Sequence, residues 1–210
     1  SLLVFITKDL TPWAPGRMEP ATEFSDGAAA VRIYEHGAMR PGAVVLGPSG
    51  ETLAEVREAV MLKNFSEGMA PAHKSPGWGY IDKSGRWTVP PKFTNAEPFS
   101  EGLARIQSGQ HWGFIDATGA PVIPPRYDWA GDFSGGLAAV CVDERGERAC
   151  GYVDKTGKTV IPMRYREAFV FASGTALVKV DDRQYKYIGK TGRDVWETAF
   201  DQSDVRRLRP

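Results

Sequence analysis

A repeat of about 34 residues runs along this 210-residue chain and limits what the chain can fold into. The segment Phe-Ser-Glu-Gly-Leu-Ala at residues 99–104 returns as Phe-Ser-Gly-Gly-Leu-Ala at residues 133–138. Looser copies begin at Phe24, Phe65 and Phe171. Such a spacing is typical of a chain in which one small unit stacks on copies of itself.

A second element recurs at the same spacing. Trp-Gly-Tyr-Ile-Asp at residues 78–82 returns as Trp-Gly-Phe-Ile-Asp at residues 112–116. Further copies lie at residues 150–154 and 185–189, and weaker ones at 43–47 and 3–7. We therefore expect a single repeat domain over residues 1–204, followed by a basic tail at 205–210. The approximate repeats are 1–27, 28–68, 69–102, 103–136, 137–174 and 175–204.

The apolar runs within each unit are short and rich in aromatic and β-branched residues, which predicts strands rather than helices. The Asp-x-x-Gly segments at 82–85, 116–119 and 154–157 predict tight hairpin turns, with Asp as the cap and Gly at positive φ. Prolines at 90–91, 124–125 and 162 are expected to end the third strand, because proline has no N–H to donate. Each unit is thus predicted to be a three-stranded antiparallel meander.

One such unit cannot bury its apolar face alone, so neighbouring units must stack. We predict an all-β fold of tandem three-stranded antiparallel β-meander repeats, stacked as an open twisted or propeller-like array. The 23 glycines and 15 prolines suit such a turn-rich chain better than a helical one. Residues 51–64 leave two interpretations open. Leu53, Val56 and Val60 would share one face of a helix, whereas the repeat alignment, which we favour, gives a strand followed by a loop.

Three linked motifs resemble a known family: Trp-Gly-Tyr-Ile-Asp-Lys-x-Gly, Pro-Pro-x-Phe/Tyr and Phe-Ser-Glu-Gly-Leu-Ala. Together they resemble the WG β-repeat family of bacterial proteins, most closely over residues 65–180 and recognisably over 1–204. The chain departs from the pattern at Cys150, which replaces the Trp, and at Tyr185 and Lys186, which replace Trp-Gly. The resemblance implies a bacterial origin and a repeat-built, non-catalytic scaffold. We accordingly expect no enzymatic activity, cofactor or metal site.

The two cysteines predict a cross-strand disulfide. Cys141 is expected to end one strand and Cys150 to begin the next, on either side of a loop at 142–149. The alternative is a pair of buried free thiols in a cytoplasmic protein. A disulfide would favour an oxidising compartment such as the bacterial periplasm or cell envelope, with any targeting segment outside this chain.

Residues that the repeat does not explain are the candidates for partner binding. Trp87 and Trp129 are indoles at positions where other repeats carry polar residues, and Trp is enriched at interface hot spots. His111 and Tyr34, in stretches that connect strands, are predicted to join such a surface. The alternative is that each residue packs over a local gap in the scaffold.

Charge and motifs narrow the functional classes. The 26 basic and 26 acidic residues give no electrostatic reason to expect a nucleic acid or an anionic membrane. No apolar run approaches the roughly 20 residues of a membrane span. We hypothesise that the protein is a non-catalytic scaffold that binds a macromolecular partner, and we expect this partner to be a protein. One version of the hypothesis is an immunity or inhibitor protein that acts against a bacterial toxin. The alternative is a carbohydrate or cell-wall binding module in which Trp87 and Trp129 stack on sugar rings.

Overall fold

The computed structural model describes residues 17–20, 22–35, 38–39, 42–144 and 146–198. These residues form strands, turns and loops without any helix, which confirms the all-β class. Residues 51–64 hold strands β5 (Thr52–Val56) and β6 (Met61–Leu62), so the repeat alignment was the correct interpretation of this segment. The expected strand at 3–7 and the basic tail at 205–210 lie outside the described residues. No helix long and apolar enough to cross a membrane occurs in the part that is described.

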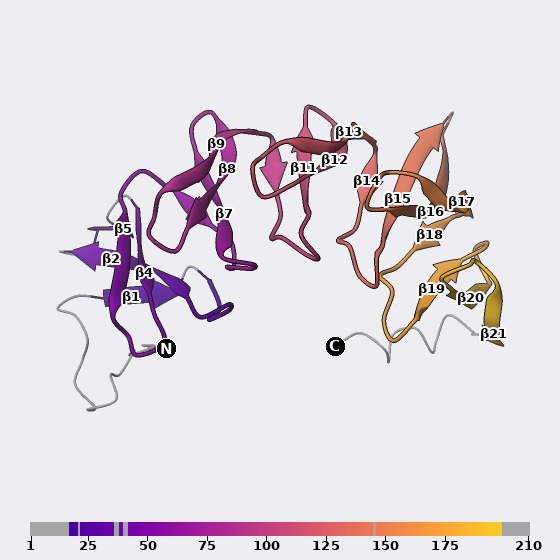
Figure 1. The fold of residues 1–210 in the computed structure, drawn as a ribbon, viewed down its shortest axis with the longest axis horizontal. Coiled ribbons are helices and arrows are strands. Elements are labelled where there is room, and N and C mark those ends of the chain that lie inside the picture. The colour runs from indigo at the N-terminus through magenta and orange to yellow at the C-terminus, as the bar shows by residue number, and fades with distance from the viewer. Residues whose placement is uncertain (1–16, 21, 36–37, 40–41, 145, 199–210) are drawn as a thin grey trace. The chain divides into compact units, whose positions relative to one another are not determined.

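Five small antiparallel sheets follow one another along the described chain (Figure 1). The first has the order β1-β2-β4-β5, with β1 (Arg17–Pro20), β2 (Ala29–Glu35), β4 (Ala43–Leu46) and the short β3 (Ala38–Met39) beside β2. The second is β6-β7-β8-β9, with β7 (Met69–Lys74), β8 (Gly77–Asp82) and β9 (Trp87–Phe93). The third is β10 (Asn95–Ala96), β11 (Ala104–Ser108), β12 (His111–Ile115) and β13 (Pro121–Tyr127).

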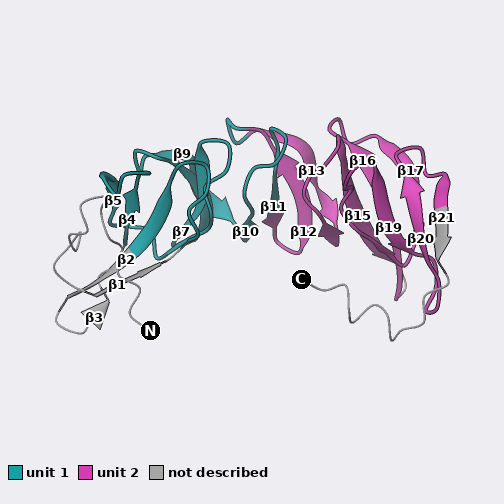
Figure 2. Ribbon diagram, turned by 90° about the horizontal axis from the view of Figure 1, so that it is seen from below, with its two compact units in different colours: residues 1–106, 117–119 teal, residues 107–116, 120–210 magenta. Residues whose placement is uncertain are grey.

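The fourth sheet is β14 (Trp129–Ala130), β15 (Leu137–Glu144), β16 (Glu147–Asp154) and β17 (Thr159–Tyr165). The fifth is β18 (Glu167–Ala168), β19 (Thr175–Lys179), β20 (Tyr185–Gly189) and β21 (Asp194–Thr198). The chain divides into two compact units (Figure 2). Unit 1 comprises residues 1–106 and 117–119, and unit 2 comprises 107–116 and 120–210.

Each repeat contributes four strands rather than the three expected from the sequence. In the second to fifth sheets the additional strand has only two residues and pairs with the first long strand of its sheet, whereas β1 of the first sheet has four residues. Met61 pairs with His73 in this way, and Glu167 pairs with Lys179. Two residues are too few to show an alternating pattern, which is why the short strand is not visible in the sequence.

The prolines lie within the third strand, so the expectation that they end it was wrong. Strands β9, β13 and β17 continue through residues 90–91, 124–125 and 162. Each third strand is the edge of its sheet, where a missing N–H leaves no ladder bond unmade. Trp78 pairs with Phe93 and Tyr80 with Val89, so four steps of β9 cover two steps of β8. The prolines therefore build a bulge.

This bulge explains the glycine of each Trp-Gly pair. A Cβ on Gly79 would lie 2.3 Å from the carbonyl oxygen of Val89. The corresponding distances to backbone oxygens are 2.5 Å for Gly113 and 2.4 Å for Gly151. Backbone cannot yield as a side chain can, so only glycine fits beneath the bulge.

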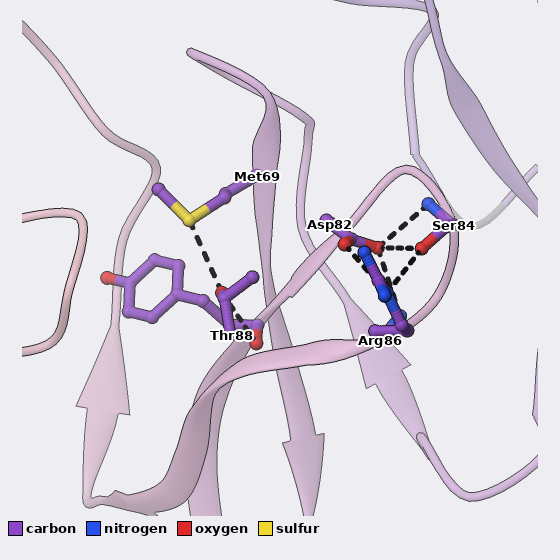
Figure 3. A network of polar contacts seen from close by, with 6 residues as sticks. Met69, Asp82, Ser84, Arg86 and Thr88 are labelled. Atoms are coloured by element: carbon purple, nitrogen blue, oxygen red, sulfur yellow. Dashed lines mark hydrogen bonds and ion pairs between the residues drawn. The ribbon is translucent and has the colours of Figure 1, made fainter.

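The Asp-x-x-Gly turns form as predicted. The Oδ1 atom of Asp82 accepts hydrogen bonds from the backbone amides of Ser84 (2.9 Å) and Arg86 (3.1 Å) and from the Ser84 hydroxyl (Figure 3). Gly85 has φ 77°. Burial raises the pKa of Asp82, but these hydrogen bonds outweigh burial and hold the pKa below its ordinary value. Asp154 caps its own turn through Thr156 and Lys158 in the same way.

Aromatic pairs fill the core of the stack. Three phenylalanines of these recurring segments meet the aromatic residue after Trp-Gly or Cys-Gly edge to face, as in Tyr80 with Phe99 and Tyr152 with Phe171, both with ring centroids 4.9 Å apart. The Tyr152 hydroxyl donates to the Phe169 carbonyl at 2.7 Å. Burial raises the pKa of that hydroxyl, because the ionised form has lost its hydration.

Serine hydroxyls join successive repeats within each unit. In unit 1, Ser25 donates to the Phe65 carbonyl and Ser66 to the Phe99 carbonyl, both at 2.7 Å. In unit 2, Ser134 donates to the Phe171 carbonyl at 2.7 Å. The recurring Phe-Ser segment is therefore both a core element and an inter-repeat joint.

We expect Gly151→Ala to destabilise the protein by about 2 kcal/mol or more, because the added Cβ collides with the backbone of β17. Equilibrium denaturation measures the change. Gly189→Ala is the matched control, since its Cβ would make only ordinary contacts, with a Val195 methyl at 3.4 Å and the Arg193 carbonyl oxygen at 3.9 Å. Equal midpoints for the two variants would contradict the steric explanation.

We expect Asp82→Ala to cost about 1 kcal/mol at pH 7, because three donors in the turn lose their acceptor. A carboxylate with a lowered folded-state pKa adds stability above its unfolded pKa, about 3.9, and that stability is lost as the pH falls through the lowered value. The difference between variant and wild type should thus shrink below about pH 4. Thermal unfolding at several pH values measures it, and a constant difference would refute the assignment.

Candidate partner-binding surface

The four predicted binding residues occupy different settings. Trp87 lies in β9 of unit 1 and is half-buried against the core that contains Ala54 and Val56. Trp129 forms the start of β14 in unit 2 and is half-buried against the core around the two cysteines. Part of each indole therefore packs against the scaffold, as the alternative interpretation expected, and part of it is accessible. Tyr34 belongs to β2, where its backbone pairs with Arg17 and Met39, and its side chain is outside the described part of the chain.

The predicted disulfide joins Cys141 and Cys150. The two residues are directly opposite each other on β15 and β16, and both are buried. The expected eight-residue loop at 142–149 was wrong, because β15 continues to Glu144 and β16 begins at Glu147. Charged residues extend these strands beyond the core, where the hydrophobic pattern gives no sign of them.

The disulfide occupies a position at which the sheets differ in chemistry. The equivalent cross-strand pair is His73 with Trp78 in the second sheet, where the rings meet at 5.3 Å, and Lys179 with Tyr185 in the fifth. The short strand supplies a third residue beside each pair. We call these residues the variable end of each sheet; they are Met61, His73 and Trp78, then Trp129, Cys141 and Cys150, then Glu167, Lys179 and Tyr185.

A connected group of side chains surrounds Trp129 in unit 2, and we call it the Trp129 cluster: His111, Asp128, Trp129, Asp143 and Arg148. The Nδ1 atom of His111 lies 3.3 Å from Oδ1 of Asp128. The other oxygen of Asp128 accepts a hydrogen bond from the Asp143 amide at 2.7 Å. The Arg148 guanidinium lies 5.8 Å from the Trp129 ring centroid, and its Nε lies 3.9 Å from Oδ1 of Asp143. The structure thus brings His111 and Trp129 into one group through Asp128.

The cluster offers an aromatic face, a cation, an imidazole and carboxylates at the surface. The side chains of His111 and Asp143 are 52 % and 51 % exposed, and that of Arg148 is 43 % exposed. Such a group can stack on an aromatic ring, pair with charges and accept or donate hydrogen bonds. Asp128, Asp143 and Arg148 were not selected from the sequence. The only available signal was that Asp128 directly precedes the off-pattern Trp129.

Unit 1 holds a different polar group at its variable end. The Lys63 ammonium lies 2.8 Å from Oε1 of Glu97, donates to the Asn95 side chain at 2.9 Å and sits 4.7 Å from the Trp78 ring centroid. The Lys63 and Glu97 side chains are 27 % and 20 % exposed, so much of this ion pair is covered. Sequence reasoning missed the group because its members come from two successive sheets, in or next to β6, β8 and β10.

The fifth sheet carries charges at the same place. The Lys179 ammonium lies 3.4 Å from Oε1 of Glu167 and 3.7 Å from Oδ1 of Asp182. Burial lowers the pKa of Lys179, but its hydrogen bond and charge interaction with Glu167 outweigh burial and raise the pKa overall. Three sheets with the same backbone arrangement thus carry three different sets of side chains at this end. A scaffold whose binding surface varies while its fold is kept requires such an arrangement.

We expect reduction of the Cys141–Cys150 disulfide to lower stability by about 2–3 kcal/mol, as the unfolded chain gains freedom when a short loop opens. Denaturation with and without reductant measures the change. The control is a variant with Ser at both positions, whose stability should not change when reductant is added. No loss of stability on reduction would contradict a stabilising role for the bridge.

Comparison with known proteins places these observations in a family. The WG containing repeat matches residues 78–110, 112–145 and 151–183. No curated protein matches the chain. Similar solved structures include a eukaryotic initiation factor (TM-score 0.58, 14 % identity, covering 91 % of this chain and 56 % of the other). BamB from Moraxella catarrhalis has TM-score 0.51 and 13 % identity, covering 85 % of this chain and 64 % of the other.

Hsv2p from Kluyveromyces lactis is also similar, with TM-score 0.50, 8 % identity, and coverage of 87 % of this chain and 62 % of the other. This chain spans less than two thirds of the length of each of these structures, and at such identities the similarity concerns the fold alone. The match of three tandem copies agrees with the Trp-Gly glycines, bulges and turns described above. The chain therefore belongs to the WG repeat family, with its tandem repeats at residues 78–183.

Proposed function

We propose that this protein is a non-catalytic scaffold that binds a protein partner through the Trp129 cluster of unit 2. The observation that carries the proposal is the connected, partly exposed group of His111, Asp128, Trp129, Asp143 and Arg148. It lies at the variable end of its sheet, where the repeats differ in side-chain chemistry.

The residues that recur in the repeat already have structural tasks. The Trp-Gly glycines lie beneath the bulge, the turn carboxylates cap the hairpins, and the serine hydroxyls join neighbouring repeats. Repeat scaffolds keep such residues and vary the others for recognition. The variable end is therefore the part of each sheet that supports a binding role.

Trp129 suits a protein partner better than a sugar. One side of the indole packs on the core around the disulfide, and Arg148 lies over the ring. An aromatic side chain that stacks on a sugar needs an open ring face. A Trp that is fixed by packing and lies beside an Arg is more typical of a hot spot in a protein–protein interface. Fixing the side chains in advance also lowers the entropic cost of binding.

The biological version that we propose is an immunity or inhibitor protein that occludes a bacterial toxin. Small repeat proteins that present one adaptable surface suit this task. The Cys141–Cys150 disulfide supports a location in an oxidising compartment such as the bacterial periplasm. These points motivate the proposal and are open to the following test.

We expect Trp129→Ala combined with Arg148→Gln to abolish retention of a stoichiometric partner from an extract of the native organism, because the anchor and its cation are removed together. The matched control is Met61→Ala, at the equivalent short-strand position in unit 1, where the side chain is exposed. Circular dichroism checks that all baits are folded.

Retention by the Met61→Ala bait and loss by the double variant would support the proposal. Equal retention by both baits would contradict the assignment of the surface. Binding of the wild type to peptidoglycan or glycan resin, with no protein retained, would favour the carbohydrate-binding alternative instead.

A further inference from the structure

A row of exposed valines marks the third strands of unit 2. Val122, Val160 and Val195 each stand three residues after a turn glycine, and they are 37 %, 39 % and 58 % exposed. In unit 1 the equivalent residue of β9 is Thr88, whose hydroxyl donates to the Tyr80 carbonyl at 3.2 Å (Figure 3). The scaffold therefore accepts a polar residue here, and it does not require the valines.

Fixed basic side chains lie on the same strands as two of these valines, in β13 and β17. The Arg126 guanidinium donates to the Gly157 carbonyl at 3.0 Å and to the Tyr127 hydroxyl at 2.8 Å. Arg164 repeats the arrangement one sheet later, with the Gly192 carbonyl at 3.2 Å and the Tyr165 hydroxyl at 3.0 Å. Each guanidinium thus lies against the next turn. The residue after the turn glycine is again basic in both cases, and these residues are Lys158 and Arg193.

The last turn of unit 2 lacks the carboxylate that the others have. Asp154 caps its turn and its charge lies close to Lys158. In the next turn Gly189 stands at the Asp position, so Lys190 and Arg193 have no capping carboxylate beside them. Asp194 is engaged by the Lys186 ammonium at 2.9 Å.

A second carboxylate is missing at the same place. In unit 1, Lys83 follows the capping Asp82 and pairs with Asp26, at 3.2 Å. In the last sheet of unit 2 the equivalent lysine is Lys190, and its Nζ lies 3.0 Å from the point that a Cβ of residue 135 would occupy. Residue 135, however, is Gly rather than an acid. The two acidic positions that pair with Lys83 and Arg86 in unit 1 are thus glycines beside Lys190 and in the turn that carries Arg193, which adds local positive charge there.

We propose that this outer face of unit 2, formed by Val122, Val160, Val195, Arg164, Lys190 and Arg193, binds an extended acidic segment of a protein partner. The inference rests on the proposed function and names the chemistry of the partner and a second contact area. Carboxylates of the segment pair with the basic residues, while its apolar side chains lie on the valines. Alternate side chains of an extended chain point to opposite sides, so every second residue of the segment points towards this face. A segment in which acidic and apolar residues occur in pairs therefore presents both kinds to the face.

The face suits a polypeptide better than an anionic membrane. Its apolar residues are single valines, one for each repeat, whereas membrane-binding surfaces insert larger Trp, Phe or Leu side chains. The formal net charge of the whole chain is zero, so the positive excess is local and gives specificity to one segment.

The test uses the full chain and a fluorescent twelve-residue peptide that repeats Glu-Glu-Val-Val, with fluorescence anisotropy as the readout. We expect binding that weakens as salt rises, and we expect Lys190→Gln with Arg193→Gln to weaken it about tenfold or more. The same peptide with Lys in place of Glu should not bind. The matched control is Lys83→Gln with Arg86→Gln, since the same positions in unit 1 face Asp26 and Asp82.

Gly189→Asp gives the sharpest comparison. It introduces the carboxylate found at positions 82, 116 and 154 and fits sterically, since a Cβ at residue 189 meets only ordinary contacts. We expect it to weaken peptide binding about tenfold while leaving the protein folded, and Gly189→Ala to bind as the wild type does.

Three results would overturn the inference: wild-type affinity in Gly189→Asp, equal binding of the Lys peptide, or binding to phosphatidylglycerol vesicles without binding to the Glu peptide. Trp129→Ala should bind the peptide normally, because it lies outside this face. If the peptide does not bind, the proposal for this face is wrong, but the proposal that the Trp129 cluster binds a partner is not affected.

Discussion

The close approach of a bulged edge strand to the glycine of each Trp-Gly pair is the constraint on which the repeat depends. The carbonyl oxygen of Val89 and the prolines after it cover the Cα of Gly79, and the same contact recurs at Gly113 and Gly151. The bulge brings four steps of the third strand over two steps of its neighbour. Because the contact lies within one sheet, it persists where Cys replaces the preceding Trp, at Cys150.

Much of the fold was predictable from the sequence because it depends on local chemistry. The Asp-x-x-Gly segments fix the turns, and the spacing of aromatic residues indicates strands and stacked repeats. The two-residue strands were not predictable, since pairing such as that of Trp129 with Cys141 depends on the neighbouring strand rather than on a pattern. The prolines were misinterpreted because an edge position, which removes the need for an N–H, is a property of the sheet.

The candidate surfaces were predictable only in part. Trp129, His111 and the disulfide were identified from departures from the repeat, and the structure connects them through Asp128. The roles of Arg148 and Asp143 depend on the length of the β15–β16 hairpin, which the hydrophobic pattern underestimates. The positive charge near Lys190 arises from two glycines that occupy acidic positions. Both glycines are visible in the sequence, but only the structure places Gly135 beside Lys190.

The two-residue strands also bear on how such a chain can grow. Strands β6 to β9 form one continuous segment that begins with the short strand and ends at Phe93, and β14 to β17 form another that ends at Tyr165. A duplication that begins at the short strand copies a complete sheet as one cassette. A duplication that begins at the Phe-Ser motif would leave the first long strand without its outer partner. Gene rearrangements that lengthen proteins of this kind should therefore join just after the aromatic residue of the third strand.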